Sequence, residues 1–209
     1  MRVDINCKEE NKIKNIVLMA TSGGAGKDTV ADYIVNELSN GKYVKRALGD
    51  PIHRLSEKYC RGRVERHHLQ DVGEQMRKIF GEDVWMRDVD QFISESDKDV
   101  VIPDIRKLIE FAHYRTEKGY LPLYIKVDEA VAKKRLIERD GSYNEEDLQR
   151  GIESQMRFIE SLPVEKVGDT GLMRTIGSSV FRDIYIVDNS SSLSNLKVQL
   201  NEWWRVING

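Results

Sequence analysis

Short apolar runs alternate along the chain with longer segments in which apolar residues recur every three or four positions. A run bounded by polar residues or glycine is typical of a buried strand, whereas the wider spacing indicates one buried face of a helix. Five strand-like runs lie at residues 14–20, 43–48, 99–104, 123–127 and 184–187. Helical spacing is found at residues 27–38, 52–60, 69–80, 84–94, 107–118, 130–139, 148–159 and 193–207. This alternation predicts an α/β fold with a five-stranded parallel sheet and helices on both faces.

Sheets of this kind bind ligands beyond the carboxyl ends of their strands, so the loops after the predicted strands are the places to look for chemistry. One stretch interrupts the alternation. Residues 140–163 are polar and show little core signal apart from the helix predicted at 148–159, which makes them a candidate lid. Because we find no interdomain linker, we predict a single domain over residues 1–209, with its core at 13–139 and 164–209.

Composition narrows the class of protein. Of 209 residues, 40% are hydrophobic and 33% are charged, which is typical of a folded globular chain rather than a disordered one. The formal net charge of -2 disfavours a nucleic-acid partner. The longest uninterrupted apolar run, residues 16–20, is far shorter than the roughly 20 residues of a membrane span. Cys7 and Cys60 form no CxxC pair and no Cys/His cluster, so we expect a reducing, cytoplasmic location.

The loop after the first predicted strand carries the strongest chemical signal. Residues 21–29 join that strand to a helix, and there consecutive backbone N–H groups and the helix N-terminus can surround a phosphate. Compared with the consensus G-x-x-x-x-G-K-[ST], Thr21 replaces the first glycine and Asp28 replaces the hydroxyl residue. A plain glycine-rich turn is the alternative, but a lysine at a helix start, where the dipole disfavours a cation, favours a bound anion. The residues assigned to this phosphate site are Ser22, Gly23, Gly24, Ala25, Gly26, Lys27, Asp28 and Thr29.

A carboxylate and several arginines follow the later strands. Asp104 comes just after the apolar residues 100–102, at a position from which an acidic side chain holds Mg²⁺ directly or through water. Capping of the next helix is the alternative role for Asp104. Arg106 suits bidentate capture of a phosphate. Arg135 and Arg139 share one helix face just before the candidate lid, where like charges repel unless an anion such as a triphosphate bridges them.

Taken together, these motifs resemble those of the P-loop kinases, and specifically of the phage-type deoxynucleoside monophosphate kinases. Phosphomevalonate kinase and dephospho-CoA kinase are related members. The resemblance extends from about residue 14 to residue 139, and the last predicted strand and helix also fit the family's fold. It rests on SGGAGKDTVAD (22–32), GDPIH (49–53), LQDVG (69–73) with Arg77, FG (80–81) and Trp85, VIPDIR (101–106) and RLIER (135–139). The resemblance implies the three-layer P-loop NTPase fold, with residues 52–98 as a helical acceptor-binding region and 140–163 as a helical lid.

The same resemblance implies roles for individual residues. The loop and its lysine would hold the phosphates of ATP, Thr29 and Asp104 would hold Mg²⁺, and Asn189 would lie near the adenine. Lys27 and Arg106, with the lid arginines Arg135 and Arg139, form the implied catalytic set. The acceptor would be bound by Asp50, His53, Arg77, Trp85 and Arg106.

The sequence departs from the family pattern on the acceptor side. His53 stands where a lysine is common, and Glu74 stands where threonine is usual. We therefore expect an ATP-dependent phosphotransferase acting on a small phosphorylated acceptor, with a deoxynucleoside monophosphate as the first choice. Dephospho-CoA or phosphomevalonate is the nearby alternative acceptor. A P-loop ATPase or nucleotide-binding switch without an acceptor is the alternative from another class. We expect a monomer or a homodimer.

Overall fold

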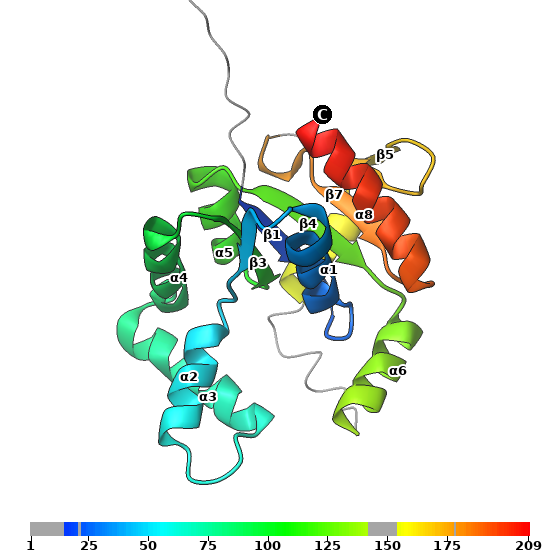
Figure 1. The fold of residues 1–209 in the computed structure, drawn as a ribbon. Coiled ribbons are helices and arrows are strands. Elements are labelled where there is room, and N and C mark those ends of the chain that lie inside the picture. Colours follow the sequence, from blue (N-terminus) through cyan, green and yellow to red (C-terminus); the bar gives the residue numbers. More distant parts are fainter. Residues whose placement is uncertain (1–14, 21, 142–153, 178) are drawn as a thin grey trace, which may run out of the picture.

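A sheet of seven strands forms the centre of the protein (Figure 1). The computed structural model describes residues 15–20, 22–141, 154–177 and 179–209. Across the sheet the strands follow the order β2-β3-β1-β4-β7-β6-β5, and the first five of them pair in parallel. The strands are β1 (Ile16–Met19), β2 (Tyr43–Lys45), β3 (Asp99–Ile105), β4 (Leu121–Lys126), β5 (Val164–Lys166), β6 (Met173–Thr175) and β7 (Tyr185–Asp188).

All five predicted parallel strands are present, but the prediction of a purely parallel, five-stranded sheet is wrong. Strands β5 and β6 extend the sheet beyond β7 and pair antiparallel to each other and to β7. Each is only three residues long and partly polar, with Glu165 and Arg174 facing each other across the pair. Backbone pairing with β7, rather than an apolar run, holds these strands in place, so hydrophobic patterning does not reveal them.

Helices cover both faces of the sheet. The predicted helix at 27–38 is continuous but changes from α-helix to a wider π turn after Tyr33, and the helix at 107–118 changes in the same way. The helices are α1 (Lys27–Tyr33), η1 (Ile34–Leu38), α2 (Asp50–Tyr59), α3 (Arg66–Phe80), α4 (Val84–Glu95), α5 (Leu108–Ala112), η2 (His113–Glu117), α6 (Glu129–Asp140), η3 (Ser154–Ser161), η4 (Ser179–Phe181) and α8 (Leu193–Asn208).

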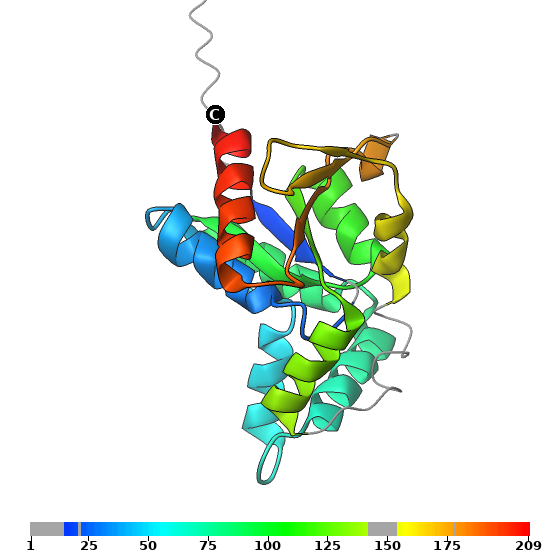
Figure 2. The same ribbon diagram turned by 90° about the vertical axis from the view of Figure 1, so that its right-hand side faces the viewer.

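Two apolar cores lie on opposite faces of the sheet. Alternate residues of a strand point to opposite faces, so Ile16 and Leu18 join one core while Val17 and Met19 join the other. Helices α1 and α8 cover the first face, and α4, α5 and η3 contribute buried residues to the second (Figure 2). Because both faces are buried, the central strands are continuously apolar, which is why the sequence pattern detects them.

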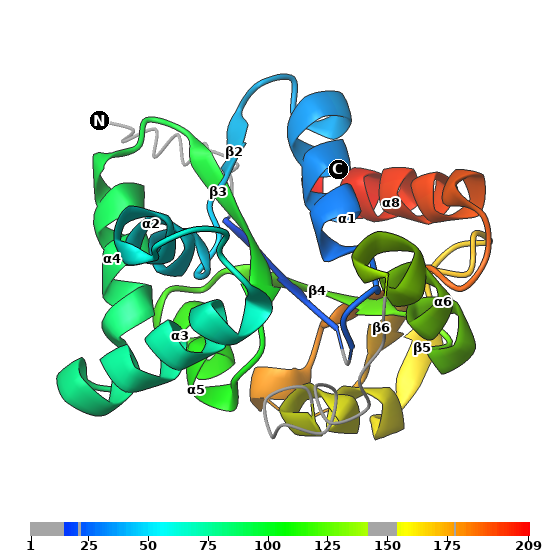
Figure 3. The same ribbon diagram turned by 90° about the horizontal axis from the view of Figure 1, so that it is seen from below.

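Because the strands are parallel, the loops that follow their carboxyl ends all lie at one edge of the sheet, which Figure 3 shows from below. Residues 22–26, 46–49, 106–107, 127–128 and 189–192 form these loops. Helices α2 and α3 lie together beside this edge, away from the sheet (Figures 1 and 3). Apart from the first two residues of α2, they fall in the stretch 52–98 that we predicted to bind the acceptor, and this role stays a prediction. Of the candidate lid at 140–163, residues 142–153 lie outside the described residues, and η3 occupies part of the remainder.

Among the helices in the described ranges, none has the length and apolar character that crossing a membrane requires.

Candidate functional site

The glycine-rich loop after β1 turns sharply into α1. Gly24 and Gly26 have φ angles of 77° and 84°, in the left-handed region that side chains with a Cβ rarely adopt. Gly26 is the residue just before the helix, and among the described residues no side chain caps the N-terminus of α1. The helix then runs from Lys27 through η1 to Leu38. Its N-terminal N–H groups are therefore left for a ligand or water rather than for a protein cap.

Two elements pack closely against this loop. A Cβ on Gly24 would lie 2.6 Å from the carbonyl oxygen of Ala132 in α6, so only glycine fits there. From the same helix, Arg135 points its Nη1 at the carbonyl oxygen of Gly24, 3.5 Å away. On the other side, the buried Asn189 follows β7 and lies against Gly26. The structure thus brings Arg135 and Asn189 to the loop, although the sequence separates them widely from it.

The surroundings of Asp28, which replaces the hydroxyl residue of the consensus, show how its charge is accommodated. Lys27 is half-buried at the first position of α1, while Asp28 and Thr29 are exposed. The carboxylate of Asp28 lies 3.5 Å from Nζ of Lys45 in β2, and the same Nζ lies 2.6 Å from Asp32. Lys45 therefore offsets the negative charge that Asp28 places beside the predicted phosphate site.

Asp104 fastens β3 to the loop that precedes α2. It is the second-last residue of β3, which continues one residue beyond the predicted end of the strand. Its Oδ1 accepts a hydrogen bond from the backbone N–H of Leu48, and its Oδ2 accepts one from Gly49, each at 2.8 Å. Burial raises the pKa of Asp104, against the lowering effects of Arg106 and these two N–H groups. In this arrangement both carboxylate oxygens already have protein partners.

These contacts matter for the predicted magnesium ligands. Thr29 lines a groove between α1 and α8, together with residues such as Tyr33 and Leu196, whereas Asp104 faces the loop before α2. Direct coordination by Asp104 would have to share an oxygen with a backbone N–H, while coordination through water would leave both bonds intact. Within the described ranges, no group of three or more His, Cys, Asp or Glu side chains could hold a metal. Mg²⁺ beside a nucleotide is usually bound by one or two carboxylates together with phosphate oxygens and water.

We expect Asp104→Ala to lower the free energy of unfolding by about 1–2 kcal/mol, because it leaves two partly buried N–H groups without their acceptor. Urea unfolding followed by tryptophan fluorescence measures the change. Asp97→Ala, at an exposed position ahead of β3, is the matched control and should change stability by less than about 0.5 kcal/mol. Equal losses in the two variants would mean that Asp104 does not stabilise the 48–49 loop.

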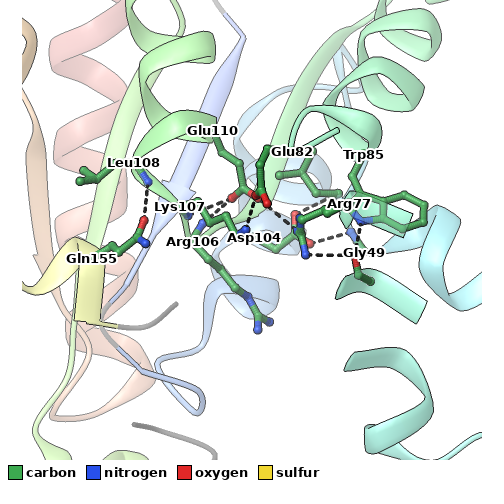
Figure 4. A network of polar contacts seen from close by, with 12 residues as sticks. Gly49, Arg77, Glu82, Trp85, Asp104, Arg106, Lys107, Leu108, Glu110 and Gln155 are labelled. Atoms are coloured by element: carbon green, nitrogen blue, oxygen red, sulfur yellow. Dashed lines mark hydrogen bonds and ion pairs between the residues drawn. The ribbon is translucent and has the colours of Figure 1, made fainter. Parts of the chain in front are cut away.

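Glu110 organises the start of α5, a role that we did not predict. Its Oε2 accepts hydrogen bonds from the backbone N–H groups of Arg106 (2.9 Å) and Lys107 (3.0 Å). Its Oε1 lies 3.4 Å from Nη2 of Arg77, which comes from α3 (Figure 4). Burial raises the pKa of Glu110, and the two N–H groups and Arg77 oppose this effect. The sequence did hold a signal, because Glu110 lies in the first turn of the helix predicted at 107–118, where an acidic side chain can cap the helix.

Two predicted acceptor residues are engaged in the packing of α3. Arg77 is mostly buried against Glu110, and its Nη1 also reaches the carbonyl oxygen of Gly73, at 3.4 Å. Trp85 is 3% exposed, and its indole N–H donates to the same carbonyl at 3.2 Å. In this conformation Trp85 fixes α4 against α3 and offers almost no surface to an acceptor.

Arg106 differs from Arg77 in being exposed. Figure 4 shows its side chain pointing away from Glu110 and Arg77. Only its backbone N–H joins the network, and its guanidinium forms no hydrogen bond or ion pair with another described residue. Of the two arginines assigned to the acceptor, Arg106 is therefore the one that is available to a ligand in this structure.

The remaining predicted residues lie around the same edge. Asp50 accepts a hydrogen bond from the N–H of Ala47 at 2.9 Å, and so shapes the loop before α2. His53 is exposed in the first turn of α2. Arg139 lies one turn beyond Arg135 on α6 and is exposed. Ser22, Gly23 and Ala25 complete the loop, with Ala25 buried. Thr21 lies outside the described residues.

Comparison with known proteins adds evidence about the fold. The sequence matches no family model and no curated protein. Among solved structures, TT1252 from Thermus thermophilus aligns with a TM-score of 0.55 and 17% identity, over 95% of this chain and all of that chain. A gluconokinase from Sinorhizobium meliloti 1021 aligns with a TM-score of 0.51 and 18% identity, over 93% of each chain. The chain therefore has, over almost its whole length, an α/β fold that it shares with a kinase.

Proposed function

We propose that this protein is a phosphotransferase that moves the γ-phosphoryl group of ATP to a small acceptor. The observation that carries the proposal is the uncapped N-terminus of α1, reached through two left-handed glycines and beginning with Lys27. Such a helix end concentrates N–H groups and positive potential, and Lys27 adds a full charge. The fold shared with a gluconokinase supports the same class of reaction.

A contrast between helices strengthens this proposal. The backbone N–H groups just ahead of α2 are held by Asp104, and those just ahead of α5 are held by Glu110. Carboxylates of the protein thus occupy two of the places at this edge where an anion would bind. The loop before α1 has no such carboxylate cap within the described residues. Together with the two left-handed glycines and Lys27, this contrast favours α1 as the place of the triphosphate. Recognition of the acceptor would then depend on side chains.

The residues present fit such a reaction. The N–H groups at the start of α1 and Lys27 would hold the phosphates of ATP, and Arg135 would approach them from α6. Bound Mg²⁺ would neutralise charge on the phosphates. An acceptor oxygen forms a bond to the γ-phosphorus while the bond to the β-phosphate oxygen breaks, and ADP leaves with that electron pair. Catalysis then rests on positioning and on charge stabilisation by Lys27 and the arginines.

For the acceptor we propose a small phosphorylated molecule, most simply a deoxynucleoside monophosphate. Arg106 supports this choice because its exposed guanidinium suits a phosphate. Arg77 is joined to the same loop through Glu110, which binds the Arg106 backbone N–H. A phosphate acceptor is already an anionic nucleophile, so it needs no general base. The resemblance of the sequence motifs to phage-type deoxynucleoside monophosphate kinases supports the nucleotide. Dephospho-CoA and phosphomevalonate are the alternative phosphorylated acceptors.

The test is ADP release from Mg-ATP with a panel of acceptors and a control without acceptor. The panel holds deoxynucleoside and ribonucleoside monophosphates, dephospho-CoA, phosphomevalonate and gluconate, the last because a gluconokinase shares the fold. Stimulation by one phosphorylated compound or a small set supports the proposal. Stimulation by gluconate alone keeps the phosphotransferase and overturns the phosphorylated acceptor. An equal rate in every reaction identifies an ATPase instead.

A further inference from the structure

The turn after β7 is bonded directly to the phosphate loop. Nδ2 of Asn189 donates a hydrogen bond of 2.8 Å to the carbonyl oxygen of Ala25. Asn189 is 5% exposed, and its backbone N–H donates to the carbonyl oxygen of Lys126 at the end of β4. Ala25 lies between the two left-handed glycines, so this bond holds the middle of the turn.

The close fit at Gly26 is specific to this contact. A Cβ built on Gly26 would lie 2.5 Å from Nδ2 of Asn189, closer than real side chains approach one another. Glycine is therefore needed at position 26 for two reasons. Its backbone is left-handed, and the Asn189 amide occupies the space that a Cβ would fill. The amide occupies the space beside the loop that a side chain would otherwise fill.

The turn that carries Asn189 is itself fixed on both sides. Gln199 in α8 accepts from the backbone N–H of Asp188 and donates to its carbonyl oxygen, at 2.9 and 3.0 Å. Ser190 accepts a hydrogen bond of 2.9 Å from the N–H of Asp128, just before α6. The turn thus joins the phosphate loop to the start of α6, the helix whose Ala132 and Arg135 pack on the other side of the loop.

We propose that Asn189 is a positioning residue for the phosphate loop. By holding the carbonyl of Ala25, it orients the peptide groups whose N–H atoms face the phosphates. This inference rests on the proposed function of the loop as a triphosphate site. It assigns the Asn189 amide to the loop itself, whereas the sequence resemblance implied a place near the adenine.

The two roles differ in the ligands that they affect. A positioning residue acts on the phosphates alone, so Asn189→Ala should weaken the binding of ATP, GTP and inorganic tripolyphosphate by a similar factor. We expect roughly tenfold, because the carbonyl of Ala25 loses a buried hydrogen bond. A contact to adenine would weaken ATP binding and leave GTP and tripolyphosphate binding unchanged. Asn208→Ala is the matched control, because it removes an exposed amide of α8 that donates to the carbonyl oxygen of Trp204 in the same helix, and it should bind all three ligands normally.

A double-mutant cycle tests the fit directly. Gly26→Ala alone should weaken tripolyphosphate binding much more than Asn189→Ala does, since the new Cβ meets both backbone strain and the amide of Asn189. In the Asn189→Ala background the amide is gone, so Gly26→Ala should reduce binding by a smaller factor than it does in the normal chain. Equal factors in the two backgrounds would overturn the proposed packing. Circular dichroism melts check that each variant is folded at the temperature of the binding assay.

Lys27→Ala separates failure of this inference from failure of the proposed function. If Lys27→Ala binds tripolyphosphate as well as the normal chain does, the loop is not the phosphate site and both proposals fall. If Lys27→Ala loses binding while Asn189→Ala keeps it for all three ligands, only the positioning role is overturned. Selective loss of ATP binding in Asn189→Ala would also overturn it, in favour of an adenine contact.

Discussion

Replacing Lys27 by alanine is expected to lower the rate of phosphoryl transfer by about 100- to 1,000-fold, the usual cost of removing one group that stabilises transition-state charge. Lys27 begins α1 at the end of the glycine turn, where its charge and the N–H groups of the helix act on the same phosphates. The measurement is the initial rate of ADP formation at saturating Mg-ATP, with the acceptor identified by the panel. Lys27→Arg keeps the charge but not the compact ammonium, and should recover only part of the rate.

Lys134→Ala provides the matched control for this prediction. Lys134 is a strongly exposed lysine of α6 that lies 3.9 Å from Glu138, so its loss removes one positive charge without touching the loop. Its rate should stay within about twofold of normal, since exposed pairs of this kind contribute little. If Lys27→Ala retained the full rate, phosphoryl transfer would have to occur elsewhere on the protein.

The sequence predicted the parallel strands because a strand that is covered on both faces is apolar along its whole length, and this pattern is visible within the strand itself. Strands such as Ile16–Met19 must be apolar on both faces, so each is recognisable on its own. The short β5 and β6 depend instead on their pairing with β7, a partner that patterning along the chain does not indicate. Patterning therefore identified five strands and missed the two that exist only through their neighbours.

In the candidate site, too, local features were predictable from the sequence, whereas contacts between distant residues were not. Spacing alone pointed to the candidate phosphate loop, because its glycines and lysine lie within one short segment of the chain, where they form the turn and the helix start. The partners of that loop were not predictable in this way. The bond from Asn189 to Ala25 spans 164 positions, and the pair of bonds from Asp104 reaches back to Leu48 and Gly49. Such contacts follow from the order of strands in the sheet, which the sequence pattern does not specify.

Glu110 shows how burial changes the interpretation of a charged residue. In the sequence it is one of 35 acidic residues, and only its place in the first turn of a predicted helix, where an acidic side chain can act as a cap, sets it apart. In the structure it is 3% exposed and partly neutralises Arg77. Arg77 and Arg106 therefore differ in their availability to a ligand, because Arg77 is bound to the Glu110 carboxylate and Arg106 is exposed.

That difference leads to the second large effect. Arg106→Ala should raise the KM for a phosphorylated acceptor roughly 10- to 100-fold, which is the loss expected for charge-assisted hydrogen bonds to a phosphate. The KM for ATP should change little, because Arg106 lies at the carboxyl end of β3 rather than on the loop before α1. Stability should also change by less than about 0.5 kcal/mol, since the bond from its backbone N–H to Glu110 is kept. Steady-state kinetics with each substrate varied in turn measures both constants.

Arg54→Ala is the control for charge alone. Arg54 is a half-exposed arginine of α2 that pairs with Asp88, so the variant lowers the positive charge of the same region without removing Arg106. Its acceptor KM should rise at most a fewfold, through long-range attraction that 0.5 M salt would screen. Arg77→Ala, by contrast, leaves the buried Glu110 without its cation and should reduce stability as well as acceptor binding. If Arg106→Ala and Arg54→Ala raised the acceptor KM equally, the effect would be one of net charge, and Arg106 would not contact the acceptor.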